Sequence, residues 1–393
     1  MRRVRDIGFF ITVVVIIAGS GCKKPFNPTI IATNSNYLVV EGVINTGQDS
    51  TIIKLSRTVN ISDKITANPE PGARVTVESD HNSSYPLNEI AYGEYASPSL
   101  NLTASYKYRL HITTSVGKEY LSDFESVSTN PPIDSVGFTV QNNGVQLYVN
   151  THNPANNTRY YRWEYAETWN FHAEYAAAYI TNGTKLNYRT ADQQIYSCFA
   201  NNTSGVVLLG SSAKLSNDVI YQQPLTQITS TSEKIEAKYS ILVKQYALTS
   251  DGYNFWQNLK KNAEQLGTIF APLPSEVPGN VHCVTTPSEP VIGYVSVTNV
   301  QQKRIFISSD QLPSSWRPVY PYECEIDTML YCRGPTCGQN DVALFLLPIG
   351  STEFAIVPYT SKGFTLGYLA ADSECADCTI RGTNKAPSFW TNK

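Results

Sequence analysis

The chain has 393 residues and a formal net charge of −3 at pH 7. This length exceeds that of one small sandwich and predicts two domains or slightly more. Only 16% of the residues are charged, against about 25% in an average soluble protein, and the missing basic excess argues against a nucleic-acid partner. The 25 tyrosines, together with many Thr, Val and Ile, favour strands over helices.

The first 22 residues have the pattern of a secretory signal of the lipoprotein type. Basic residues precede an apolar run, and the small residues 18–21 precede Cys22. The run of about 11 apolar residues is shorter than the roughly 20 that a spanning helix needs. We therefore expect residues 1–21 to be a signal peptide and Cys22 to anchor the protein to a membrane by lipid. Removing 1–21 takes away three arginines and one aspartate, which changes the net charge from −3 to −5. The alternative is an ordinary signal peptide with a chance cysteine, and Gly19 departs from the usual Leu.

Residues 22–36 read as a polar tether, and residues 37–130 as an N-terminal β-sandwich. Residues 106–113 alternate apolar and polar side chains with period two, which is typical of a half-buried strand. Leu100, followed six residues later by Tyr106, resembles the tyrosine corner of immunoglobulin-like domains. Several short strands of this kind, separated by turn residues, predict an antiparallel sandwich.

Asn130-Pro131-Pro132 marks a boundary, because proline keeps the chain extended there. A second sandwich is expected over residues 131–320, with strands that include 136–141, 145–150, 160–168 and 235–248. Tyr161, Trp163 and Tyr165 share one face of the third strand and are predicted to lie in the core. Residues 170–233 read as a polar, irregular insertion.

One helix is predicted near residues 250–266, with Ser250 as N-cap and Gly267 beyond its end. The segments 291–300 and 304–309 read as a hairpin across Gln301-Gln302, and two more strands are expected near 342–347 and 354–359. The predicted fold class is therefore mostly β: two immunoglobulin- or fibronectin-III-like sandwiches, one docked α-helix and a disulfide-stapled C-terminal region, residues 321–393, packed on the second domain.

Eight cysteines are present, and seven remain if Cys22 is lipidated. A secreted chain meets an oxidising compartment, so disulfides are expected, and an odd number leaves at least one thiol unpaired. The disulfide candidates are Cys283, Cys324, Cys332, Cys337, Cys375 and Cys378. The alternative is a four-thiolate zinc site built from Cys332-x4-Cys337 and Cys375-x-x-Cys378. We expect disulfides, with no metal and no cofactor.

The chain carries no Gly-x-Ser-x-Gly, His-Glu-x-x-His or phosphate-binding glycine loop. We therefore expect a protein that is not an enzyme; a hydrolase with an unrecognised carboxylate pair is a third hypothesis without specific support. The aromatic residues beyond the third strand of the second domain, Trp169, Phe171 and Tyr175, are candidate binding residues, because exposed aromatic groups mark contact sites. The alternative is that they belong to the core.

Several strings occur in a fixed order through the mature chain: residues 160–165, 239–248 with 253–256, 279–283, 290–294, 304–306 and 375–390. Together they resemble the Bacteroidota outer-membrane lipoproteins of domain-of-unknown-function family 4249. The resemblance implies an outer-membrane lipoprotein with no established activity, encoded beside TonB-dependent transporters, and hence a ligand-binding or accessory role in nutrient uptake.

Lys23 follows the lipid cysteine, where an Asp would favour the inner membrane, and no acidic cluster follows Cys22. The cell surface and the periplasmic face therefore both stay open. The alternative function is a surface adhesin or structural spacer, which predicts a rod without a transporter partner.

Overall fold

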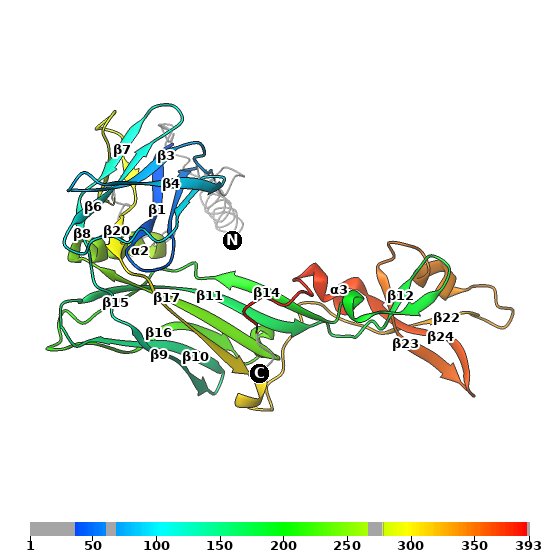
Figure 1. Cartoon of the computed structure of the whole chain (residues 1–393). Coiled ribbons are helices and arrows are strands. Elements are labelled where there is room, and N and C mark those ends of the chain that lie inside the picture. The colour runs from blue at the N-terminus through cyan, green and yellow to red at the C-terminus, as the bar shows by residue number, and fades with distance from the viewer. Residues whose placement is uncertain (1–35, 60–67, 266–276, 278, 391–393) are drawn as a thin grey trace, which may run out of the picture.

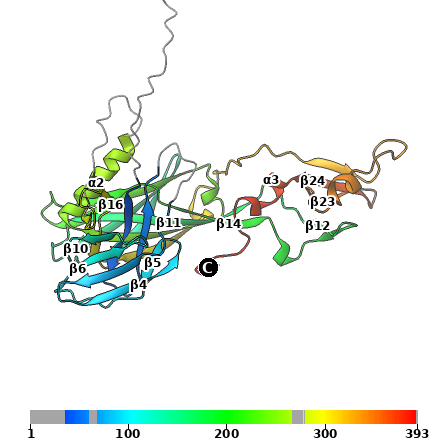
Figure 2. The same ribbon diagram turned by 90° about the horizontal axis from the view of Figure 1, so that it is seen from above.

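The computed structural model describes residues 36–59, 68–265, 277 and 279–390. The expected signal peptide, Cys22, the tether up to residue 35 and Gly267 lie outside these residues. The described chain is mostly β and forms two β-sandwiches at one end and a smaller module that extends away from them (Figure 1). We call residues 174–195 and 321–377 the distal module. Figure 2 shows the same elongated arrangement from above. Among the described residues, none of the helices combines the length and apolarity that crossing a bilayer requires.

The first sandwich is one continuous path of strands that folds over a core. Its members are β1 (Leu38–Asn45), β2 (Thr51–Arg57), β3 (Arg74–Ser79), β4 (Ser84–Ala91), β5 (Glu94–Ser97), β6 (Lys107–Thr113), β7 (Glu119–Ser122), β8 (Glu125–Ser126), β18 (Val281–Cys283), β19 (Val291–Ile292) and β20 (Ser296–Thr298). The order is β18-β7-β6-β3-β4-β5-β2-β1-β19. Strand β4 closes the sandwich, because its first half pairs with β3 and its second half with β5.

The first sandwich also contains chain that the sequence prediction gave to the second domain. Strands β19 and β20 pair in parallel with β1, through Leu38↔Val291 and Ile44↔Val297. The predicted hairpin between 291–300 and 304–309 is therefore wrong. The apolar alternation was read correctly as strand, but alternation does not say which strand is the partner. Val297 fills the first core, whereas the next strand belongs to the second sandwich.

A tyrosine corner is present, but Tyr108 forms it rather than the predicted Tyr106. The Tyr108 hydroxyl accepts a hydrogen bond from the Thr103 N–H at 2.7 Å and donates to the Thr103 carbonyl at 3.0 Å. Tyr108 is fully buried in strand β6, so its phenol has to find partners inside the protein. Tyr106 precedes the strand and is only half-buried.

The second sandwich packs two sheets face to face, as in immunoglobulin-like domains, and confirms the predicted fold class. One sheet has the order β16-β10-β9, and the other has β14-β11-β17-β21 with β15 beside β11. The strands are β9 (Ile133–Gln141), β10 (Gly144–Asn153), β11 (Tyr160–His172), β14 (Ser197–Thr203), β15 (Leu208–Ser211), β16 (Asp218–Thr229), β17 (Lys238–Leu248) and β21 (Gln301–Ser308). Residues 170–233, predicted as irregular, thus supply several strands.

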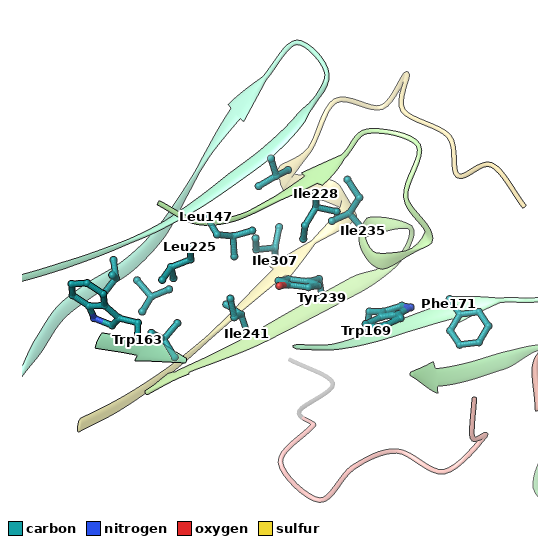
Figure 3. Packing of buried hydrophobic residues seen from close by; sticks show 14 of the residues in the cluster. Leu147, Trp163, Trp169, Phe171, Leu225, Ile228, Ile235, Tyr239, Ile241 and Ile307 are labelled. Atoms are coloured by element: carbon teal, nitrogen blue, oxygen red, sulfur yellow. The ribbon is translucent and has the colours of Figure 1, made fainter. Parts of the chain in front are cut away.

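The core between these sheets is apolar, with Trp163 and Tyr239 among its largest fully buried side chains (Figure 3). Gln245 is buried in it with its polar groups satisfied. Its Oε1 accepts from the Trp163 indole N–H at 2.9 Å, and its amide donates to Asn130 Oδ1 at 3.0 Å. Asn130 in turn donates to the Asn299 carbonyl at 2.9 Å. Asn130 and Asn299, which lie where the chain passes from the first sandwich to the second, are therefore bonded to each other.

The predicted helix is observed as α2 (Ser250–Gln265). Its N-cap is Thr249 and not Ser250, because the Thr249 hydroxyl accepts a hydrogen bond from the Gly252 N–H at 3.1 Å. The helix rests on the outer face of the β11–β17 sheet, where the Arg162 guanidinium lies 4.2 Å from the Trp256 ring centre. This cover explains why Arg162, on the polar side of its strand, is buried.

The distal module joins the insertion of the second sandwich to the C-terminal region. The hairpin β12 (Tyr179–Thr181) and β13 (Leu186–Tyr188) packs beside the sheet β22-β24-β23, formed by β22 (Asp327–Leu330), β23 (Glu353–Ser361) and β24 (Phe364–Asp372), followed by the short helix α3 (Ser373–Ala376). The predicted strand near 342–347 is wrong, because Val342–Leu346 is a π-helix that buries Val342 and Leu346.

In the described part of the chain, the C-terminal region packs on the second sandwich through residues 378–390, which include Cys378, bonded to Cys198, and Arg381, paired with Glu233. Trp390 contacts Phe199 and Phe306, with ring centres 5.0 Å and 5.6 Å apart. The rest of that region projects with the distal module (Figure 1).

Candidate functional site

Three disulfides fix the distal module and its junction with the second sandwich: Cys198–Cys378, Cys324–Cys375 and Cys332–Cys337. Five of the predicted disulfide candidates are paired, and Cys198 is a partner that the prediction missed. These pairings contradict the four-thiolate zinc alternative, because its sulfurs are all oxidised. The described residues also contain no group of three or more His, Cys, Asp or Glu placed to hold a metal ion.

Cys283 was predicted as a disulfide candidate and is not one. It is buried in the first sandwich as the free thiol among the described residues. Strand β18 pairs it with Tyr120 of β7, in a different domain from the paired cysteines. Its sulfur accepts a hydrogen bond from the Thr286 N–H at 3.3 Å. The spacing of cysteines along the chain does not reveal which domain a strand joins, so the sequence could not exclude Cys283.

The predicted binding residues Trp169 and Phe171 lie inside the protein. Strand β11 runs to His172, so the inward alternation of Tyr161 and Trp163 continues to both aromatic residues. Phe171 is fully buried and Trp169 is 8% exposed, and both belong to the second core. The expectation of an exposed aromatic contact site at these positions is therefore wrong, because the strand is longer than its sequence pattern indicated.

Tyr175 is half-buried in the distal module and has a structural contact. Its hydroxyl donates to the Cys324 carbonyl at 3.3 Å, and its ring packs against the small core around Cys375. The Tyr175 backbone N–H also bonds the Cys375 carbonyl at 3.0 Å. Tyr175 thus helps to join the two segments that make up the distal module.

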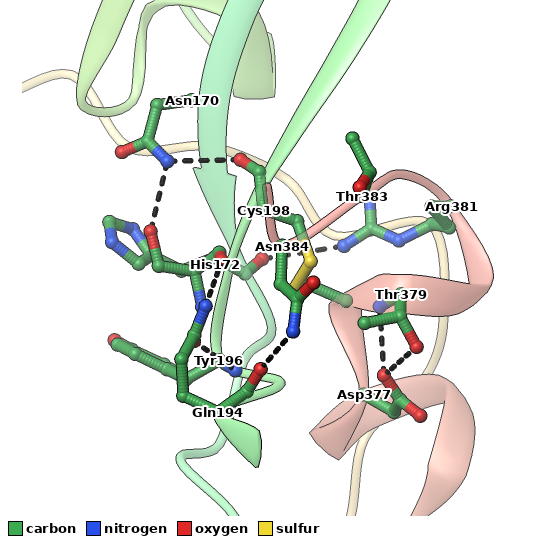
Figure 4. Close-up of a disulfide and its surroundings, with 12 residues drawn as sticks. Asn170, His172, Gln194, Tyr196, Cys198, Asp377, Thr379, Arg381, Thr383 and Asn384 are labelled. Carbon is green, nitrogen blue, oxygen red and sulfur yellow. Dashed lines mark hydrogen bonds between the residues drawn. A yellow bond between two sulfur atoms is a disulfide. The ribbon is translucent and has the colours of Figure 1, made fainter. Parts of the chain in front are cut away.

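The junction below the distal module is held by charge as well as by Cys198–Cys378 (Figure 4). Arg381 forms an ion pair with Glu233 and lies 4.6 Å over the Phe171 ring. Asn384 donates to the Gln194 carbonyl at 2.8 Å. The Trp169 indole N–H donates to Glu233 at 3.2 Å. These contacts lock the direction in which the distal module leaves the second sandwich.

Two hollows are candidates for a ligand site, and the first lies in the N-terminal sandwich. It has a volume of about 540 Å³ and is lined by charged residues near the start of the described chain. Arg57 donates to Glu70 at 2.7 Å, the Tyr120 hydroxyl donates to Glu289 at 2.7 Å, and Lys118 pairs with Glu289. Burial acts to raise the pKa of Glu289, but the bonds from Lys118 and Tyr120 hold it below its ordinary value.

The charges of this first hollow are therefore paired with one another. Arg57 also donates to the Asn36 carbonyl at 3.2 Å, where the described chain begins. A network that satisfies its own charges stabilises structure and offers little to a ligand. We interpret this hollow as the clamp that fixes the entry of the chain into the first sandwich.

The second hollow lies in the distal module and has a volume of about 290 Å³. We call it the distal pocket. Its walls come from both segments of the module and are largely apolar: Tyr179, Ile180, Leu186, Ile195, Leu346, Ile349, Phe354 and Ala355. Three ionisable residues also line it, namely Arg189, Glu353 and Asp377. Apolar walls with a few convergent polar groups are the usual composition of a small-molecule site.

Arg189 forms no ion pair in the described part of the chain. One of its terminal nitrogens donates to the Gln193 carbonyl at 3.2 Å, and its Nε is buried without a hydrogen-bond partner. Burial lowers the pKa of the Arg189 guanidinium, opposed only by the charge of Asp377. The guanidinium lies 5.5 Å from the Phe354 ring centre. The pocket thus holds a cation that the protein itself does not neutralise by direct contact.

Glu353 is the second unusual group of the distal pocket. Burial raises its pKa to about 7, and the hydrogen bond and charge of Asp372 and the charge of Asp327 act in the same direction. Glu353 and Asp372 are paired across strands β23 and β24. The Glu353 Oε2 is buried without a hydrogen-bond partner. Near neutral pH this carboxyl group is therefore protonated in a large fraction of molecules.

The family model of the domain of unknown function DUF4249 matches residues 23–304 of the chain. The chain belongs to this family. No curated protein matches it. A solved structure that resembles it is the two-fibronectin-type-III-domain segment of chicken tenascin, with 12% identity, a TM-score of 0.16, and coverage of 54% of this chain and 91% of that chain.

The DUF4249 match spans both sandwiches and the insertion that supplies one side of the distal pocket, whereas the other side lies beyond residue 304. Residues 279–283 and 290–294 have structural explanations. The Asn280 Oδ1 accepts from the Val295 N–H at 2.8 Å, and the Asn280 side-chain amide donates to the Val295 carbonyl at 3.0 Å. A side chain at Gly293 would collide with the Val40 carbonyl of β1. These two segments position β18–β20 against β1 and β7.

Large apolar side chains are exposed over much of the distal module. The most exposed are Ile349 at 83%, Phe364 at 73% and Tyr188 at 71%. They are accompanied by Ile326, Tyr331, Leu344, Phe345, Val357, Tyr359 and Leu366. Such a concentration of exposed apolar groups marks an interaction surface more often than a surface left to water. No signal in the sequence separated these residues from the core residues that alternate with them.

Proposed function

We propose that this protein is a non-catalytic, lipid-anchored binding protein of the outer membrane, which serves a TonB-dependent transporter as an accessory or ligand-binding subunit. Cys22 carries the lipid, as the signal pattern of residues 1–22 indicates. The location and the transporter partner come from the resemblance to DUF4249 lipoproteins. The distal module supplies recognition.

The observation that carries this proposal is the position of the exposed apolar groups. Strand β1 begins at Leu38, at the end of the first sandwich away from the Asn130–Asn299 junction. The distal module leaves the second sandwich beyond His172 and extends away from both sandwiches (Figure 2). The start of the described chain and the exposed apolar surface are thereby separated by the two sandwiches. The disulfides and the Arg381–Glu233 ion pair hold the module in a fixed direction. A braced arm that presents apolar side chains away from the two sandwiches suits docking on a membrane protein partner.

A hydrolase gains no support from the carboxyl pair Glu353 and Asp372 of the distal module. Glu353 lies directly opposite Asp372 in the β23–β24 pair, and the nearby Asp372 carboxyl group helps to raise the pKa of Glu353, whereas the carboxyl groups of glycosidases stand about 5–9.5 Å apart with the substrate between them. Asp372 does not line the pocket. The pair is better explained as a shared proton between adjacent strands.

An adhesin or spacer is the remaining alternative, and the elongated shape fits it. A spacer has no need for a pocket that contains an unpaired arginine, and this difference favours a binding role. The binding proposal predicts capture of a TonB-dependent transporter, whereas a spacer predicts no transporter partner. The following experiment measures this capture.

The test compares the full-length protein with variants of the distal surface by co-purification from native membranes. Phe364→Asp and Leu366→Asp place charge on the exposed β24 hairpin strand, and Val116→Asp is the control, since Val116 is 76% exposed on the first sandwich. We expect the wild-type protein and Val116→Asp to capture a TonB-dependent transporter, and the two distal variants to lose it. Equal capture by all four proteins, or capture by none, would overturn the proposal.

The anchor is tested separately. Cys22→Ala should move the protein from the membrane pellet to the soluble fraction. A variant that stays with membranes after a high-salt wash, without lipid by mass spectrometry, would show that lipid is not the anchor.

A further inference from the structure

The distal pocket has mostly apolar walls and contains one cationic side chain, Arg189, that has no counter-ion within the protein's described residues. Arg189 is the only arginine or lysine that lines it, and among the described residues no carboxylate lies within ion-pair distance of this guanidinium. Asp377, which also lines the pocket, is engaged elsewhere: its Oδ1 accepts from the Thr379 N–H at 2.8 Å and from the Thr379 hydroxyl at 2.6 Å. Neutralisation of Arg189 by direct contact is therefore left to a ligand.

An arginine cannot lose its proton in a protein, so partial burial leaves it charged and poorly solvated. The group that best satisfies a guanidinium fork is a carboxylate or phosphate, through parallel charge-assisted hydrogen bonds. Phosphate is the poorer fit here, because the walls are mostly apolar and no second cation lines the pocket. A carboxylate needs only the one arginine.

The size and walls of the pocket define the rest of the ligand. Water occupies about 30 Å³ per molecule, so the volume of about 290 Å³ has room for roughly ten non-hydrogen atoms. Phe354 and Tyr179 supply aromatic faces, and Ile195 and Leu346 supply aliphatic ones. This chamber suits an aryl or branched alkyl body.

Glu353 adjusts the charge of the pocket without opposing such a ligand at acidic to neutral pH. While it is protonated it adds no negative charge to the chamber. The charged groups that act on Glu353 are Asp372 on β24 and Asp327 on β22, while Arg189 and Asp377 line the same pocket. Once Glu353 ionises, it adds a negative charge to the lining of the same pocket, and that charge opposes the binding of an anion.

We infer that the distal pocket binds a small organic carboxylate with an apolar body, whose carboxylate group pairs with Arg189. This inference rests on the proposed binding role of the distal module and adds the chemical class of the ligand. The acid is bound reversibly, with no covalent step. Its binding is strongest below the pH at which Glu353 ionises.

The test uses the full-length protein purified in detergent and two probes of equal size, phenylacetate and its neutral amide phenylacetamide. Binding is measured by calorimetric titration at pH 6. We expect phenylacetate to bind, and phenylacetamide to bind about tenfold to a hundredfold more weakly, as the loss of a charge-assisted hydrogen bond implies. Equal affinity for both probes, or no binding of phenylacetate, would overturn the inference.

Variants test whether the preference for phenylacetate over phenylacetamide arises in the distal pocket. Arg189→Gln should bind the two probes equally. The control Arg317→Gln, an exposed arginine that donates only to the Ser314 and Trp316 carbonyls, should keep the wild-type preference. Glu353→Gln provides a second measurement, which does not depend on the folding of the Arg189 variant. Wild-type affinity for phenylacetate should fall as the pH rises from 6 to 8, and Glu353→Gln should bind more tightly than wild type at pH 8.

These measurements separate the inference from the proposed function. Loss of the preference for phenylacetate in Arg317→Gln, or its survival in Arg189→Gln, would refute the pocket as the site. A wild-type affinity that does not change between pH 6 and pH 8 would refute the role of Glu353. Transporter capture by wild type alongside either result would show that the docking role stands and that only the ligand class is wrong.

Discussion

Removal of the Cys198–Cys378 disulfide should destabilise the second sandwich far more than removal of Cys332–Cys337. The first bridge joins residues 180 apart in the sequence and the second joins residues only 5 apart. In the chain-entropy relation, bridges over loops of these lengths contribute about 5 and about 2 kcal/mol to the free energy of unfolding. The Cys324–Cys375 bridge shortens the longer loop, but the dependence is logarithmic and the change is below about 0.5 kcal/mol.

Packing adds to this difference. Both Cys198 and Cys378 are fully buried in the second core, so alanine at these positions also removes two sulfur atoms from packed surroundings. Cys332 and Cys337 are exposed in the distal module. The entropic and packing contributions therefore have the same sign, and we expect a difference of at least about 3 kcal/mol between the two double-alanine variants.

Urea denaturation followed by tryptophan fluorescence measures this difference. The five tryptophans, Trp163, Trp169, Trp256, Trp316 and Trp390, all lie in or against the second sandwich, so their fluorescence reports on that part of the chain. We expect Cys198→Ala/Cys378→Ala to unfold at a much lower urea concentration than Cys332→Ala/Cys337→Ala. Equal midpoints for the two variants would refute the loop-length argument, and an unchanged midpoint for the first would refute the bridge itself.

Three further predictions concern stability. Tyr108→Phe should lower the free energy of unfolding by about 1–3 kcal/mol, because it leaves the Thr103 N–H and carbonyl without their partner. The matched variant Tyr106→Phe should change this free energy little. Urea unfolding of both variants measures the difference. Trp163→Ala and Trp169→Ala should each lower the free energy of unfolding by about 3–5 kcal/mol, since both are core residues. An unchanged melting temperature in Trp169→Ala would show that Trp169 is an exposed contact residue instead. The folded pKa of Glu353 is about 7, above its ordinary value of 4.5, so the unfolded chain loses that proton first. Stability should therefore decline as the pH rises through this window, and urea titrations at pH 5 and pH 8 should show a smaller decline in Glu353→Gln.

Local features of this protein were predictable because the side chains themselves determine them. Period-two alternation located β6, β10 and the start of β11, since a strand with one buried face has to alternate. The helix over Ser250–Gln265 followed from apolar spacings of three and four. A surplus of cysteines near the C-terminus correctly indicated disulfides there.

Three of the errors share one physical cause, which is that a local sequence pattern does not identify its partner in the fold. Val291–Ile292 and Ser296–Thr298 have strand patterns that suit either sandwich, and only the open edge of β1 assigns them to the first. The sequence around Trp169 and Phe171 is compatible with either an exposed aromatic cluster or a longer strand. The pairing of β11 with β14 and β17 shows that the strand is longer. Cys198 could not be matched to Cys378 before the chain brought them together.

The distal pocket depends even more completely on tertiary structure. Arg189 and Glu353 are far apart in the sequence and are unremarkable there, as one arginine and one glutamate among many. They become a candidate site because β12 and β13, inserted in the second sandwich, pack beside β23 of the C-terminal region. Burial and missing partners, the two properties that make these groups unusual, arise only from that packing. The sequence by itself indicated the alternating strands, the helix over Ser250–Gln265 and a disulfide-bonded C-terminal region, but not the strands of residues 170–233 or the π-helix at Val342–Leu346. The fold decided which elements meet, because long-range contacts depend on the shape of surfaces that exist only after the strands have paired.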